Sequence, residues 1–161
     1  MKKQRYSVIP RTLCFVFDKN KRLLLIKFSK DKGDMAGYFN PPGGHIEHGE
    51  GILENAEKEI LEETGVQVSD TKLRGVVHAS NFFNKNIMLF VTVSTVNDPK
   101  LVASKEGIPS WVKLNEINNL KLMDDIKVIL EQLQKTPDNE VFTAKSSFDD
   151  EGNLLSFEVD N

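Results

Sequence analysis

Three glutamates in the stretch Gly43 to Val66, GGHIEHGEGILENAEKEILEETGV, are candidates for chemistry. Glu59, Glu62 and Glu63 stand at i, i+3 and i+4, so a helix would place them on one side. Such like charges repel one another, and partial desolvation makes the repulsion costly unless the carboxylates are protonated or matched by cations. A run of acids on its own is more typical of a solvated helix face. The alternative is a site for a hard divalent cation, which prefers oxygen ligands.

The glycine-rich turn before this helix favours the cation site. Backbone amides near a helix N-terminus suit a phosphate oxygen, and Gly43 and Gly44 open the segment. Mg²⁺ commonly couples carboxylates to substrate phosphates. A phosphate-binding turn followed by a carboxylate helix therefore predicts metal-assisted attack on a phosphoanhydride.

The helix that positions these acids is predicted over residues 52–64. Five residues form the stripe expected to pack on a sheet, with Glu63 the acid nearest to it: Ile52, Leu53, Ala56, Ile60 and Thr64. Lys58 is expected on the far side. Gly65 stands where a left-handed cap usually ends a helix.

Short apolar runs predict the strands that support the helix. They cover residues 11–18, 22–28, 72–80, 86–96 and 106–114, and a closing strand pair covers 141–160 around a turn at 149–152. Residues 29–45 are rich in Gly, Pro and Asp and predict a long functional loop. A second helix is expected over 124–135. Interleaved strands and helices predict an α/β or α+β protein with a mixed sheet flanked by helices.

Composition narrows the class of protein. The 161 residues suffice for one domain, and a net charge of −3 with a pI near 5.7 provides no basic surface for a nucleic-acid polymer. No apolar run approaches the length of a membrane span, and the first residues do not resemble a secretory signal. The single cysteine, Cys14, is expected to be buried, and a cytoplasmic location is the default. Three histidines, His45, His48 and His78, lack the spacing of a zinc site.

Residues 44–66 resemble the Nudix box, whose pattern is G-x5-E-x7-R-E-U-x-E-E-x-G-U, where U is aliphatic. Eight positions match: Gly44, Glu50, Glu59, Ile60, Glu62, Glu63, Gly65 and Val66. Lys58 stands where the family has an arginine, so it supplies charge without a planar fork. The resemblance implies an α/β/α sandwich with a mixed sheet, formed as a single domain over residues 1–161.

The same resemblance implies the ligands of a metal ion. Mg²⁺, with Mn²⁺ as a substitute, would be held by Glu59, Glu62, Glu63, Glu106 and the Gly43 carbonyl. One of the four carboxylates would take the proton of the attacking water. Glu106 could instead be an exposed loop acid.

The order of elements outside the box is similar to that of 8-oxo-dGTP pyrophosphatases of human type. This likeness implies a base pocket lined by Asn40, Asp124 and Asp125, with Thr12 nearby. Gly43 and Gly44 would meet the phosphates, and Lys27, together with Lys30, would neutralise them. Each has a simpler interpretation: Asn40 as a turn residue, the aspartates as helix caps and the lysines as solvated. Leu122 and Met123 occupy the place where those enzymes offer a large aromatic residue.

The expected activity is hydrolysis of an oxidised purine nucleoside triphosphate, such as 8-oxo-dGTP, to the monophosphate and pyrophosphate. The box is equally compatible with a pyrophosphatase of ADP-ribose, a dinucleotide or a nucleotide sugar. A module that binds a nucleotide without cleaving it is a third interpretation, although the intact glutamates argue against it. The sequence does not identify a protein partner.

Overall fold

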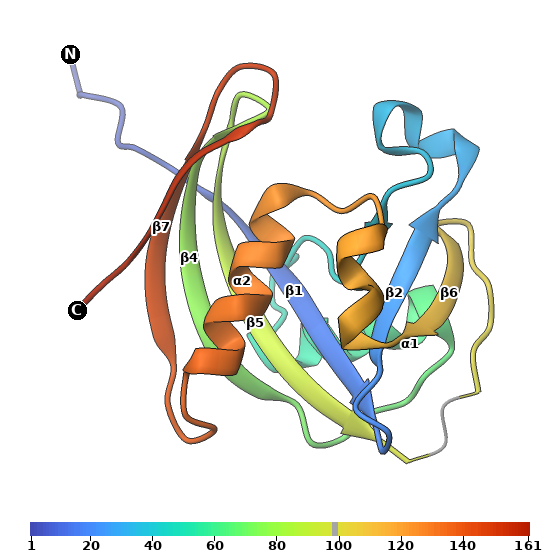
Figure 1. Cartoon of the computed structure of the whole chain (residues 1–161). Coiled ribbons are helices and arrows are strands. Elements are labelled where there is room, and N and C mark those ends of the chain that lie inside the picture. The colour runs from blue at the N-terminus through green and yellow to red at the C-terminus, as the bar shows by residue number, and fades with distance from the viewer. Residues whose placement is uncertain (98–99) are drawn as a thin grey trace.

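The computed structural model describes residues 1–97 and 100–161 and shows a mixed sheet between helices (Figure 1). Among these described residues the sheet has eight strands, and seven follow the order β3-β2-β1-β5-β4-β7-β8, while β6 pairs with β2. Their bounds are β1 Ile9–Asp18, β2 Leu23–Phe28, β3 Phe39–Asn40, β4 Lys72–Phe82, β5 Lys85–Val96, β6 Gly107–Val112, β7 Phe142–Phe148 and β8 Leu154–Val159. The pairs β1–β5 and β4–β7 are parallel, and the other pairs are antiparallel.

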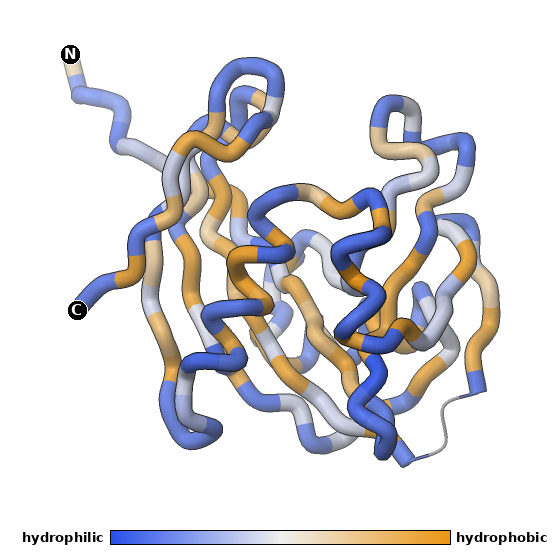
Figure 2. The backbone as a smooth tube through the Cα atoms, in the orientation of Figure 1, coloured by the Kyte–Doolittle hydropathy of each residue, from blue (hydrophilic) through white to orange (hydrophobic). Residues whose placement is uncertain are grey.

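Two helices cover opposite faces of this sheet. α1 (Ile52–Thr64) packs on a cluster that includes Cys14, Val16 and Leu24, and α2 (Asp124–Lys135) packs on a cluster that includes Leu13 and Phe15. Successive residues of β1 therefore alternate between the two cores, as the pleat of a strand requires. Figure 2 shows hydrophobic residues along the central strands and hydrophilic residues at the turns. The predicted α/β class with a mixed, helix-flanked sheet is confirmed.

Predicted element bounds agree closely with the observed ones. The first helix covers residues 52–64 as expected, and Gly65 ends it in the left-handed conformation with φ 75°. α2 also has its expected bounds, and β7 and β8 form the terminal pair around the turn 149–152. Cys14 is fully buried, as expected, and Trp111 packs against the core on the α1 face.

The structure corrects one residue of the predicted helix stripe. Leu53 is 40% exposed, whereas Asn55 is fully buried. The periodicity could not distinguish them, because an asparagine becomes a favourable core residue only when tertiary contacts satisfy its amide. The loop at 29–45 also has structure that was not predicted: the 3₁₀ helix η1 (Lys30–Met35) and the short strand β3. A second 3₁₀ helix, η2 (Leu114–Asn119), precedes α2.

Candidate active site

The glycine turn lies directly against β1 and α1. Thr12 N–H donates to the Gly44 carbonyl at 2.9 Å, and Cys14 N–H donates to the Pro42 carbonyl at 2.8 Å. A Cβ at Gly43 would stand 2.1 Å from the Thr12 carbonyl oxygen, and one at Gly44 would stand 2.7 Å from the Glu59 carboxyl carbon. At Gly43 the clash is with the backbone of β1, so only glycine fits there; a side chain at Gly44 would instead displace the Glu59 carboxylate from its position against the turn.

Asn55 joins the three segments of the site, a role that the sequence analysis missed. Its Nδ2 donates to the His45 carbonyl at 2.8 Å and to Glu50 Oε2 at 2.6 Å. Its Oδ1 accepts from the Thr12 hydroxyl at 2.7 Å. A satisfied buried amide of this kind holds its neighbours in one arrangement. The only signal in the sequence was a polar residue next to the apolar stripe, four residues before Glu59.

The structure brings Glu59 and Glu63 together and leaves Glu62 exposed beside them. Burial raises the pKa of Glu63 to about 8, and the negative charges of Glu59 and Glu106 act in the same direction. The Gly43 amide, which donates to Glu63 Oε2 at 3.2 Å, opposes that rise in pKa. The pKa of Glu59 is raised, first by burial and then by Glu62. The prediction that Glu63 lies nearest the core agrees with this arrangement.

Two lysines accompany the acids. Lys32 of η1 forms an ion pair with Glu106, which precedes β6. Lys58 forms an ion pair with Glu50, and its Nζ lies 3.9 Å from Glu59 Oε1. Lys58 and Asn55 together lower the pKa of Glu50 to about 2. Lys58 therefore faces the acid cluster, whereas the helical projection placed it on the far side of the helix.

The donor set fits a divalent cation in its chemistry. Four carboxylates and a backbone carbonyl are hard oxygen ligands, and the raised pKa values of Glu59 and Glu63 reflect repulsion and burial that a cation would relieve. Within residues 1–97 and 100–161, no three or more His, Cys, Asp or Glu side chains are grouped closely enough to hold a metal. Glu59 and Glu63 lie together at the centre of the acid cluster, whereas Glu62 is exposed and Glu106 pairs with Lys32.

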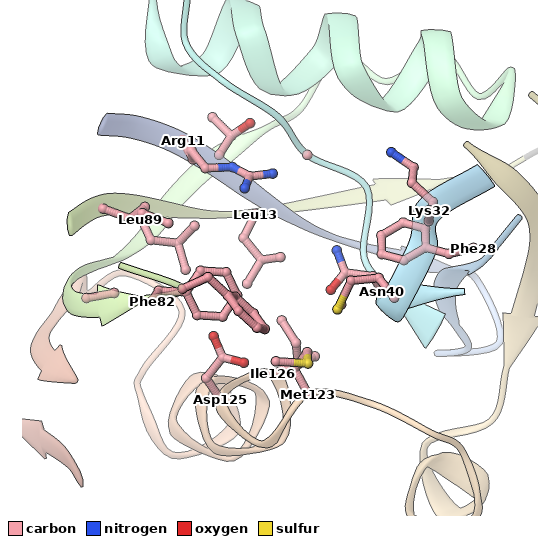
Figure 3. A pocket seen from close by; sticks show the side chains of 16 residues that line it. Arg11, Leu13, Phe28, Lys32, Asn40, Phe82, Leu89, Met123, Asp125 and Ile126 are labelled. Carbon is pink, nitrogen blue, oxygen red and sulfur yellow. The ribbon is translucent and has the colours of Figure 1, made fainter. Parts of the chain in front are cut away.

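A pocket of about 270 Å³ opens beside the glycine turn, between the sheet and the start of α2 (Figure 3). Asn40 and Asp125, both predicted for the base pocket, line it together, as do Thr12 and Gly43. Most of the other lining is apolar. The apolar residues are Leu13, Phe28, Met35, Ala79, Phe82, Phe83, Ile87, Leu89, Met123 and Ile126. Two cationic residues, Arg11 and Lys32, complete the lining.

Asp125 is the distinctive polar group of this pocket. Its Oδ1 atom is buried and has no hydrogen-bond partner in the described part of the chain. Burial raises the pKa of this carboxyl to about 6, although the backbone N–H groups of Ile126 and of Asp125 itself act to lower it. A buried acceptor without a partner in an apolar pocket suits the donor edge of a ligand.

Aromatic residues reach the pocket from a segment that the sequence analysis did not consider. Phe82 and Phe83 stand at the β4–β5 turn, where Phe83 has φ 47°, an unusual value for a bulky residue. A Cβ at Gly152, in the β7–β8 turn, would lie 2.5 Å from the Phe83 ring, so the two turns are in close contact. Aromatic rings thus line the pocket from outside the segment of Leu122 and Met123, and no local pattern could have indicated this.

Four predicted substrate residues lie outside the pocket lining: Lys27, Lys30, Gly44 and Asp124. Asp124 is exposed in the first turn of α2. Lys27 is exposed on β2, with its Nζ 5.9 Å from the centre of the Phe39 ring. For Asp124 and Lys27, the sequence neighbour, Asp125 or Phe28, faces the pocket instead.

Comparison with known proteins identifies the family of this chain. The chain is 32% identical over 154 residues to the oxidized purine nucleoside triphosphate hydrolase of Mus musculus, and 28% identical over 156 residues to the uncharacterized Nudix hydrolase YvcI of Bacillus subtilis; each match covers 92% of both chains. The crystal structure of a MutT protein from Bacillus halodurans superposes with a TM-score of 0.80 at 26% identity, over 95% of this chain and 98% of that one. No helix among the described residues could span a membrane. The NUDIX domain model matches residues 9–133, so the chain belongs to the Nudix hydrolases, which act on acid anhydrides.

Proposed function

We propose that this protein hydrolyses oxidised purine nucleoside triphosphates to the monophosphate and pyrophosphate. The observation that carries the proposal is the adjacency of two unlike sites. A pocket lined by aromatic and apolar residues, which contains the buried Asp125 Oδ1 atom without a hydrogen-bond partner among the described residues, opens at the same glycine turn that contacts Glu59 and Glu63. The 32% identity to the mouse oxidized purine nucleoside triphosphate hydrolase over almost the whole chain also supports it.

The pocket has the chemistry to select an oxidised purine. An 8-oxo group converts N7 of guanine from an acceptor into an N–H donor, which changes the edge that a protein reads. The Asp125 carboxylate accepts hydrogen bonds only, and the Asn40 amide can both donate and accept. Asn40 Nδ2 donates to the Pro41 carbonyl at 2.8 Å, which orients its oxygen side for another contact. The rings of Phe28, Phe82 and Phe83 offer stacking surfaces for the base.

The phosphate chain of such a nucleotide would extend past Gly43 and Gly44 to the glutamates. Nudix hydrolases generally use divalent metal ions, and a bound cation would neutralise anhydride oxygens and activate a water. We assign the ligands as Glu59, Glu62, Glu63, Glu106 and the Gly43 carbonyl, with Mg²⁺ as the first choice and Mn²⁺ as a substitute. One of the four carboxylates receives the proton of the water. Asn55 fixes the turn through its bonds to Thr12 and the His45 carbonyl, and the absence of a side chain at Gly44 leaves room for Glu59.

A nucleotide panel tests the proposal directly. Product release is measured with Mg²⁺ and with Mn²⁺ on 8-oxo-dGTP, 2-oxo-dATP, the unmodified triphosphates, ADP-ribose and a diadenosine polyphosphate. We expect the highest kcat/KM on the two oxidised purines, with pyrophosphate as the second product. Preference for ADP-ribose or the dinucleotide would reject the base assignment and retain the glutamate site. Binding without turnover would identify a nucleotide-binding module.

A variant of Asn40 separates base recognition from general nucleotide binding. Asn40→Ala removes an amide that faces the pocket and leaves the glutamates untouched. We expect kcat/KM to fall by roughly 10-fold for the oxidised purines, the value of one buried hydrogen bond, and to fall less for unmodified triphosphates. Equal losses on every nucleotide would contradict the role of Asn40 in base selection.

A further inference from the structure

Two partly or fully buried arginines of this protein differ sharply in their contacts. Arg74 of β4 is 7% exposed, and its guanidinium is bound by the chain itself. It donates to the carbonyls of Glu140, Thr136 and Pro137 at 2.9 to 3.1 Å, and lies 3.3 Å from Asp138 Oδ1. These contacts attach the segment between α2 and β7 to the sheet, so the role of Arg74 is structural.

Arg11 of β1 has no such contacts. It lines the pocket and is partly buried, yet among residues 1–97 and 100–161 its guanidinium makes no hydrogen bond or ion pair. Burial lowers the pKa of Arg11, and the charges of Glu63, Glu59 and Glu106 raise it. A guanidinium remains charged at neutral pH, and its five N–H donors are costly to leave unmatched away from water.

The backbone fixes where this cation stands. Arg11 forms a β-bridge with His45, and the next residue, Thr12, is hydrogen-bonded to Gly44. The side chain therefore starts beside the glycine turn. Figure 3 shows Arg11 on the α1 side of the pocket, across from Asp125, which lies on α2. Arg11 thus lies between the end of the pocket that holds Asp125 and the glutamates of α1.

We propose that the Arg11 guanidinium binds the phosphate nearest the nucleoside in the bound substrate. The inference rests on the proposed function, because it requires a nucleotide whose base enters the pocket and whose phosphates reach the glutamates. The first phosphate of that nucleotide passes the only pocket cation that the described residues leave unpaired, since Lys32 pairs with Glu106. A planar fork matches two phosphate oxygens at once and offsets the repulsion between the phosphates and the glutamates.

Steady-state kinetics of Arg11 variants provide the first test. Arg11→Gln removes the charge, and Arg11→Lys keeps the charge without the fork. On every nucleotide that the wild-type protein cleaves, we expect Arg11→Gln to raise KM by roughly 10- to 100-fold and Arg11→Lys to raise it less. Lys19→Gln, an exposed change of equal charge at the β1–β2 turn, should leave KM unaltered. An unchanged KM in Arg11→Gln would overturn the assignment.

Binding without metal distinguishes phosphate recognition from a simple counter-ion to the glutamates. Calorimetry in EDTA compares 8-oxo-dGMP with 8-oxo-deoxyguanosine, or AMP with adenosine if the panel selects ADP-ribose. The wild-type protein should bind the monophosphate more tightly than the nucleoside, and Arg11→Gln should abolish that difference while binding the nucleoside normally. If Arg11→Gln retains the wild-type ratio, and a separate Mg²⁺ titration without EDTA shows a loss of affinity for the ion, Arg11 serves the glutamates and the proposal is wrong. The ratio of monophosphate to nucleoside affinity reports only on the phosphate. The role of Arg11 can therefore be judged separately from the preference for oxidised purines.

Discussion

The two faces of the sheet each contain a carboxyl whose pKa is raised by burial, but their surroundings differ. Glu63 on the α1 face has Glu59 and Glu106 as charged neighbours and accepts a hydrogen bond from Gly43. Asp125 on the α2 face lies among apolar side chains, with Asp124 as the one like charge that raises its pKa. Clustered negative charge attracts a cation, whereas a single acceptor in an apolar pocket attracts a hydrogen-bond donor. The same direction of pKa shift is therefore compatible with the two different ligands that we propose for the two faces.

The largest effect is expected on the α1 face. Glu63→Gln removes a carboxylate from the centre of the proposed metal site and should lower kcat by about 10²–10⁴-fold, since both ion binding and proton transfer depend on these acids. Mg²⁺ should raise the Tm of the wild-type protein, because an ion that binds the folded state stabilises it, and should raise that of the variant less. Glu131→Gln, an exposed change on α2, is the control and should preserve both responses. Normal turnover by Glu63→Gln would refute the mechanism.

On the α2 face we expect a loss of selectivity. Asp125→Asn replaces an acceptor-only carboxylate with a group that also donates, so kcat/KM for 8-oxo-dGTP should fall by roughly 10- to 100-fold. The response to Mg²⁺ should stay as in the wild-type protein, because Asp125 belongs to α2, on the opposite face of the sheet from α1, which carries Glu59 and Glu63. If this variant instead lost Mg²⁺ stabilisation and kept its selectivity, the division of labour between the faces would be wrong.

The pH dependence of the free energy of unfolding provides a separate test of the buried Asp125 carboxyl. The pKa of Asp125 is about 6 in the folded protein and near its ordinary value of 3.8 when the chain is unfolded, so the folded state binds more protons between these values. Its contribution to stability is greatest below about pH 4 and declines as pH rises to about 6. Relative to the wild-type protein, Asp125→Asn should therefore gain about 1–3 kcal/mol between pH 4 and pH 7. Thermal unfolding of both proteins across this range in EDTA is the measurement, and a constant difference would show that the carboxyl is not buried.

The smallest effect concerns Lys58, where this chain departs from the family pattern. Its ammonium contacts Glu50 and lies 3.9 Å from Glu59, whereas the fork of an arginine can bind two carboxylates together. Lys58→Arg should raise kcat by roughly two- to fivefold, with little change in KM. An increase of this size corresponds to part of the free energy of one charged hydrogen bond. Lys127→Arg on α2 makes the same exchange away from the glutamates and should leave kcat unchanged. A decrease in kcat for Lys58→Arg would show that the site is adapted to lysine.

The sequence alone predicted much of the α1 face. The bounds of α1, the cap at Gly65 and the grouping of Glu59 with Glu63 all follow from periodicity and short-range sterics within one segment of 23 residues. The same local reasoning failed for Leu53 and Asn55, because burial of the amide depends on partners 5, 10 and 43 residues away. The metal ligands and the base residues themselves remain predictions.

The α2 face depended on the tertiary structure. The family resemblance named Asn40 and Asp125, and the fold brings them into one pocket, but it excludes Asp124 from the lining and adds Arg11, Phe82 and Phe83. Strand pairing and the contact between two distant turns place these side chains, and such long-range contacts have no counterpart in local periodicity. The sequence by itself therefore determined that α1 presents a group of carboxylates, because residues three and four apart along a helix lie side by side. Only the tertiary structure decided which residues line the pocket, because convergence of separate strands depends on how the whole core packs.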